Sequence, residues 1–128
     1  FNIQEKDLLA TKMSPATHAY TRHLLEIGYS GSTPEIATAI LPCSWGYSEI
    51  GKRLFKKGVP QNNPLYSRWI EMYNSDEFEQ LALWIRNFID REAKTMTSVN
   101  QETLRDIFFT STQYEYNFWN SAYTLETW

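Results

Sequence analysis

Residues 98–125 read SVNQETLRDIFFTSTQYEYNFWNSAYTL, and this stretch decides the fold class. Ser98 with Gln101 resembles a capping box, which predicts a helix from about Val99 to Leu125. At 100° per residue, one face of that helix collects Leu104, Phe108, Ser111, Glu115, Trp119 and Ala122, with Phe118 at its edge. The spacing is that of an amphipathic helix with a carboxylate in the centre of its apolar stripe.

The rest of the chain carries the start and stop signals of further helices. They are predicted from Ser14-Pro15 to Gly28, from Ser32-Thr33-Pro34-Glu35 to about Lys57, from Asn63-Pro64 to roughly Tyr73, and from Ser75-Asp76-Glu77 to about Lys94, with a shorter helix before Ser14. No segment shows the sustained period-two alternation of a strand. We therefore predict an all-α, single-domain bundle of about five helices that pack antiparallel.

Length and charge exclude several classes of protein. A chain of 128 residues suggests one domain, and a net charge of −3 argues against broad nucleic-acid binding. The basic cluster Lys52, Arg53, Lys56 and Lys57 is interpreted as complementing a helix dipole. No stretch approaches roughly 18 uninterrupted apolar residues, so no membrane span is predicted. The single cysteine cannot form an internal disulfide, which favours a reducing, cytoplasmic setting.

Glu115 is the first anomaly, because a carboxylate on an apolar helix face is costly to bury unless it is paired or hydrogen-bonded. A Glu held by buried tyrosine hydroxyls would only fix the packing. A Glu that exchanges protons with a ligand would be a general acid or base. The helix face alone leaves both interpretations open.

Cys43 is the second anomaly. It shares a predicted helix face with Ile36, Ala39, Tyr47, Ile50 and Leu54, so it is expected to point inward, one turn from Tyr47. Pro42 removes a backbone donor and is expected to kink the helix, which frees the carbonyl of Thr38. A kink could aim the sulfur into a cavity, but a buried free cysteine is more often a small hydrophobe.

The two histidines do not indicate a metal site. His18 and His23 lie about 140° apart around their helix and do not face each other as metal ligands at i, i+4 would. The sequence also lacks a glycine-rich phosphate loop, so neither a metal nor an organic cofactor is expected.

Four blocks of sequence resemble the thiaminase II (TenA) family. LPCSWGYSEIG at 41–51 is similar to the family's cysteine-containing signature L-P-C-x-W-x-Y-x-E-x-G. NPLYSRWI at 63–70 with Tyr73 resembles P-x-Y-x-x-W-I-x-x-Y, and YEYNFW at 114–119 with Ala122-Tyr123 matches the closing block. Upstream, HAYTRHL at 18–24 resembles the helix that brings a pocket tyrosine.

The resemblance implies a haem oxygenase-like helical bundle and an enzyme. Aminopyrimidines or thiamin would be hydrolysed to hydroxymethylpyrimidine, with Cys43 as the nucleophile and Glu115 as the carboxyl group that protonates a ring nitrogen. The residues implied to bind the substrate are Tyr20, Tyr47, Tyr73 and Phe118. The family's chemistry needs no metal or cofactor.

The resemblance also carries expectations about the rest of the protein. Family members have additional N-terminal helices that supply a pocket Asp, so residues 1–128 would be the C-terminal part of one domain. The resemblance implies a homotetramer. The sequence around Tyr20 is similar to that of fungal members, in which such a domain can be fused to a hydroxymethylpyrimidine kinase.

Two rival interpretations stay open. A non-catalytic binding module would keep the helical scaffold with the aromatic residues as core. A haem-binding protein would need a proximal ligand, for which His18 and His23 are the only candidates.

Overall fold

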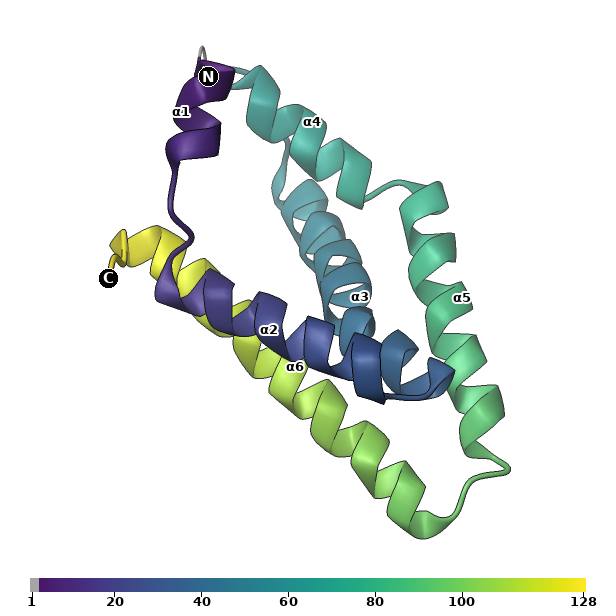
Figure 1. Ribbon diagram of the computed structural model, residues 1–128. Coiled ribbons are helices and arrows are strands. Elements are labelled where there is room, and N and C mark those ends of the chain that lie inside the picture. Colours follow the sequence, from purple (N-terminus) through teal and green to yellow (C-terminus); the bar gives the residue numbers. More distant parts are fainter. Residues whose placement is uncertain (1–2) are drawn as a thin grey trace.

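A computed structural model describes residues 3–128 as an all-α protein, as predicted (Figure 1). Its six helices are α1 (Glu5–Ala10), α2 (Pro15–Ser30), α3 (Thr33–Lys57), α4 (Pro64–Tyr73), α5 (Asp76–Ala93) and α6 (Ser98–Thr124). Within this described range, no helix is long and apolar enough to cross a membrane.

Helix α3 is the central element, because it contacts α2, α4, α5 and α6. Helix α2 lies along α6, so these two and α3 meet around one region (Figure 1). Side chains that the sequence separates by more than 70 residues can therefore converge there. Helix α1 stands apart in Figure 1 and buries none of its residues.

The predicted caps account for most helix starts. Ser14 accepts a hydrogen bond from the backbone N–H of Thr17, and Asn63 and Ser75 cap α4 and α5 in the same way. Glu35 accepts from the backbone and the hydroxyl of Ser32, each at 2.6 Å.

Two boundary predictions were wrong. Helix α2 runs past Gly28 to Ser30, and Gly31 is its C-cap. A side chain at Gly31 would meet the carbonyl oxygen of Ile27 at 2.7 Å, which explains why glycine stands there. Helix α6 is capped by Thr97, whose hydroxyl accepts from Asn100 N–H. The side chain of Gln101 instead donates to the carbonyl of Ala93 and joins the α5–α6 turn.

The two predicted helix faces are only partly buried. On α6, Leu104 and Ser111 are buried, but Trp119 and Ala122 are exposed and the buried position near the end is Ser121. On α3, which continues through Pro42, the buried residues are Thr38, Ala39, Leu41, Pro42, Ser48 and Gly51. A central helix with four neighbours is buried on more than one side, so a single stripe did not describe it.

Candidate active site

Glu115 lies between α2 and α6 and is held by Tyr20. The buried Tyr20 hydroxyl donates a hydrogen bond of 2.8 Å to Glu115 Oε1. The second oxygen, Oε2, is buried and has no hydrogen-bond partner among residues 3–128. A buried acceptor without a partner is costly, so this oxygen is set to accept a proton or a hydrogen bond from a bound molecule.

The Tyr20 hydroxyl is firmly protonated. Burial raises the pKa of Tyr20 above its ordinary value, and the hydrogen bond and negative charge of Glu115 raise it further. Tyr20 therefore stays a donor at physiological pH and leaves proton exchange to other groups.

Cys43 lies near Glu115, on the central helix α3. Loss of hydration and then the negative charge of Glu115 raise the pKa of the Cys43 thiol to about 11. The residue is exposed, so the prediction of an inward cysteine was wrong. The thiol nevertheless lies close enough to Glu115 of α6 to lose part of its hydration.

Tyr47 and Tyr73 belong to the same electrostatic environment. Burial raises the pKa of Tyr47, followed by the charges of Glu115 and Cys43. Burial also raises the pKa of Tyr73, followed by the charges of Cys43 and Glu115. The charges of the thiol and the carboxyl group thus raise the pKa values of all three predicted tyrosines, although these come from three helices.

An aromatic cluster forms one wall beside these groups. The Tyr47 ring lies 5.0 Å from Tyr73, 5.7 Å from Trp119 and 6.1 Å from Trp69 between ring centroids. Trp69 and Tyr73 are 4.5 Å apart. Such spacing is that of favourable tilted aromatic pairs, and it fixes Tyr47 and Tyr73 in place.

Phe118 is less clearly connected to the site. It is half-buried one turn after Glu115, and its ring pairs with Trp119 at 6.1 Å.

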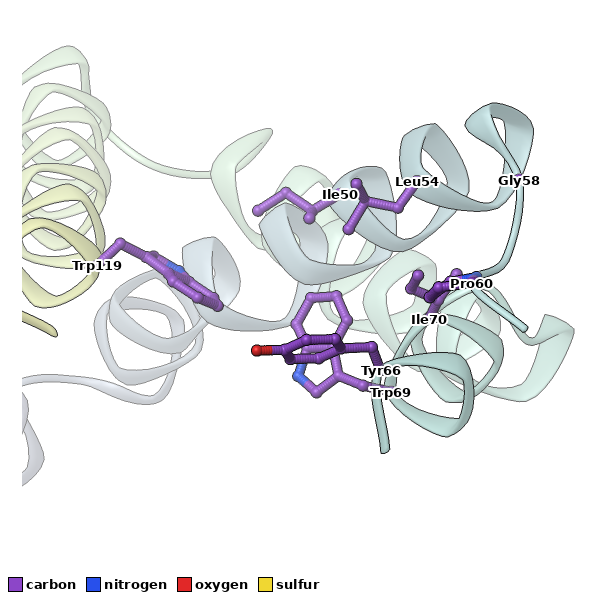
Figure 2. Close-up of a pocket in the computed structure, with 8 residues that line it drawn as sticks. All are labelled: Ile50, Leu54, Gly58, Pro60, Tyr66, Trp69, Ile70 and Trp119. Atoms are coloured by element: carbon purple, nitrogen blue, oxygen red, sulfur yellow. The ribbon is translucent and has the colours of Figure 1, made fainter. Parts of the chain in front are cut away.

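An apolar groove lies on the other side of the aromatic wall, between α3, α4 and the end of α6. Figure 2 shows Trp119 facing Tyr66 and Trp69, with Ile50 and Leu54 along one side. The groove has a volume of about 810 Å³. Neither Cys43 nor Glu115 lines it, so it is separate from the groups that can exchange protons.

A protein-family comparison covers nearly the whole chain. The TENA/THI-4/PQQC family matches residues 1–125. The chain belongs to this family.

Individual TENA/THI-4/PQQC relatives cover the chain almost completely. It is 39% identical over 128 residues to the aminopyrimidine aminohydrolase of Halalkalibacterium halodurans, a match over 98% of this chain and 56% of the relative. It is 36% identical over 126 residues to that of Bacillus subtilis, covering 98% of this chain and 52% of the relative.

The fold is shared with a solved structure, the TenA homologue protein from P. horikoshii OT3. The TM-score is 0.81 at 30% identity, over 96% of this chain and 56% of that one. The chain thus spans about half the length of the relatives it matches.

Sequence reasoning missed three residues around the candidate site. Trp69 belongs to a sequence motif and Trp119 to a predicted helix face, but neither was predicted to lie in the aromatic cluster beside the site. His23 bonds to Ser111 and lies against Tyr114, while His18 packs on Trp128. The histidines therefore do face different partners, as their spacing predicted. Within residues 3–128, no group of three or more His, Cys, Asp or Glu side chains could hold a metal ion.

Proposed function

We propose that the protein hydrolyses aminopyrimidines, such as 4-amino-5-aminomethyl-2-methylpyrimidine or thiamin, to hydroxymethylpyrimidine. The observation that carries the proposal is the convergence of Cys43, Glu115 and Tyr20 from three helices. The relatives named aminopyrimidine aminohydrolase support the substrate class.

The raised pKa of Cys43 indicates how the nucleophile must be generated. At pH 7, a thiol with a pKa of about 11 holds roughly one thiolate in 10⁴ molecules. The thiol therefore needs a base when the substrate binds. Glu115 is near, and its Oε2 has no partner in the described structure. Glu115 takes the thiol proton and delivers it to a ring nitrogen.

The reaction then proceeds in two halves. The Cys43 sulfur forms a bond to the protonated pyrimidine ring, and the ring electrons expel the leaving group from the side methylene with its bonding pair, so that a protonated aminomethyl group leaves as ammonia. Water adds to that methylene and gives up a proton to solvent. The carbon–sulfur bond then breaks, and the ring nitrogen returns its proton through Glu115 to the sulfur, which restores the thiol. For an aminomethyl substrate, the balance is one water consumed and one ammonia released per hydroxymethylpyrimidine.

In this scheme the tyrosines and Phe118 position Glu115 and the substrate ring. Tyr20 holds Glu115 through its hydrogen bond. Tyr47 and Tyr73 keep their protons and can donate to substrate atoms, and Phe118 would line the ring. Holding a flat ring against the thiol removes much of the entropic cost of the first step.

Replacing Cys43 by Ser tests the proposal. Hydrolysis of the aminomethylpyrimidine by the full protein is expected to fall by at least about 10³-fold, because the hydroxyl is a far weaker nucleophile. Ser44→Ala is the matched control, since Ser44 is the next residue and bonds only to the Leu41 carbonyl. Near-normal turnover by Cys43→Ser would show that Cys43 is not the nucleophile and would refute the proposed reaction.

One observation favours the second candidate, a non-catalytic binding module. Cys43 is exposed as a residue, and a thiol that is not ionised can also be an unused surface group. Absence of aminomethylpyrimidine turnover by the wild-type protein, with binding of the pyrimidine retained, would identify this case.

Other parts of the proposal concern the protein around the site. We expect a cytoplasmic location, because the single thiol would persist there in reduced form. Three further expectations stay predictions: assembly into a homotetramer, fusion to a kinase domain, and the assignment of residues 1–128 to the C-terminal part of the domain.

A further inference from the structure

A second hydrogen bond joins α2 to α6 one turn away from the Tyr20–Glu115 bond. His23 Nε2 and Ser111 Oγ are 2.9 Å apart, and Ser111 is fully buried. Burial lowers the pKa of His23 below its ordinary value, although the negative charge of Glu26 opposes the shift. The imidazole is therefore neutral at physiological pH and bonds to the hydroxyl as an uncharged partner.

The two bonds occupy matching positions on the two helices. Tyr20 and His23 are three residues apart on α2, while Ser111 and Glu115 are four apart on α6. Residues at these spacings lie on the same helix face in successive turns. A slide or rotation of α2 along α6 that breaks one bond therefore strains the other.

Tyr114 connects the two bonds through its ring. Tyr20 stacks on it at 5.6 Å with 10° between the ring planes. His23 lies against it at 5.1 Å. The rings of Tyr20, Tyr114 and His23 thus form a continuous row beside the two hydrogen bonds.

We propose that His23 is a positioning residue, which through Ser111 and Tyr114 sets the placement of the Tyr20 hydroxyl on Glu115. This inference rests on the proposed function, because Glu115 is the group that moves the proton there. His23 itself touches no reacting atom. Its role is to keep Oε1 of Glu115 occupied, so that Oε2 faces the incoming proton.

Kinetics of His23 variants test the role. His23→Ala is expected to lower kcat for aminomethylpyrimidine hydrolysis by about tenfold to hundredfold, because a small misplacement of a proton-transfer group slows the chemical step. KM should change by less than about threefold. His23→Gln, whose amide reaches to the place of Nε2, should recover most of kcat. His18→Ala is the matched control on the same helix, because His18 packs on Trp128 instead.

A spectroscopic readout tests the placement without relying on turnover. In protein labelled with ¹³C at tyrosine Cζ, the Tyr20 resonance is assigned by its loss in Tyr20→Phe. His23→Ala and the smaller change Ser111→Ala should both shift this resonance, while His18→Ala should leave it in place. An unmoved Tyr20 resonance in both variants would overturn the inference, as would a kcat equal to the wild type or a defect confined to KM.

The same set of measurements separates the two proposals. Wild-type protein without turnover, or Cys43→Ser with full turnover, refutes the proposed function. The Tyr20 resonance still decides whether His23 places the hydroxyl on Glu115. If instead turnover depends on Cys43 and His23→Ala shifts nothing, only the positioning role fails.

Discussion

The thiol–carboxyl site and the apolar groove are both bounded by α3 and α6, yet they differ in almost every property. The site contains the Tyr20 hydroxyl and the Cys43 thiol, whose pKa values are raised by burial and by the charge of Glu115. The groove has a volume of about 810 Å³ and is lined by aliphatic and aromatic side chains. Trp69 and Trp119 belong to the wall between them. Size alone therefore does not locate the chemistry in this molecule.

The groups able to carry out chemistry lie in the thiol–carboxyl site and not in the groove. The groove provides surface on which an apolar group can rest, and its lining carries the Tyr66 hydroxyl but no carboxylate, thiol or imidazole. The site provides a thiol, a carboxyl group with one unpartnered oxygen, and hydroxyl donors. The predictions below contrast substitutions in the two regions.

The largest contrast is expected from Glu115→Gln against Ile50→Ala. The amide cannot exchange protons, so kcat should fall by about 10²- to 10⁴-fold. Ile50 lines the groove and is 37% exposed, so its truncation should leave kcat within about threefold of the wild type. Steady-state kinetics on the aminomethylpyrimidine measure both. Equal losses of kcat in the two variants would show that the site and the groove do not differ in their contribution to catalysis.

Tyr20→Phe should have an intermediate effect. It removes the donor to Glu115 Oε1 and little else, so kcat should fall by about 10- to 100-fold, in line with the loss of a hydrogen bond to a charged group. Tyr116→Phe is the control on α6, because Tyr116 is 71% exposed. A Tyr20→Phe enzyme with unchanged kcat would show that Glu115 is positioned without this bond.

Gly51→Ala tests how closely the backbone around Tyr73 is fixed. An added Cβ would meet backbone atoms of Tyr73 at 2.6 Å, so α3 and the end of α4 would have to separate. We expect a loss of about 1–3 kcal/mol in the free energy of unfolding. Gly46→Ala lies on the same helix with open space around it, and should gain roughly 0.5–1 kcal/mol. Denaturant unfolding curves compare the two, and equal stability would contradict the close approach.

Sequence patterns predicted the helices well because their signals are local. Ser14, Asn63 and Ser75 each satisfy backbone N–H groups within three residues, so the sequence near the cap suffices. Thr97 rather than Ser98 caps α6, and the Gln101 side chain, which was expected in the capping box, instead donates to the Ala93 carbonyl of α5. This contact with α5 could not be predicted from the sequence near the cap.

The candidate site was predictable in part for the same reason. Glu115 stood out because a carboxylate on an apolar stripe needs a partner, and Tyr20 is that partner. Cys43 was placed inward because one face was assumed for α3, whereas this helix packs on four neighbours. The His23–Ser111 bond joins residues 88 positions apart. No periodicity within one helix reveals such a pair.

The most direct test of the account is the alkylation rate of Cys43 with iodoacetamide as a function of pH. Cys43 is the only cysteine in the 128 residues, so the label reports on one thiol. With a pKa of about 11, the rate should rise nearly tenfold per pH unit from pH 7 to pH 10 without a plateau. Glu115→Gln removes a negative charge that disfavours the thiolate, so its pKa should fall and its alkylation at pH 8 should be faster. A wild-type plateau near pH 9, or identical profiles for the two proteins, would show that thiol and carboxyl group do not share a site.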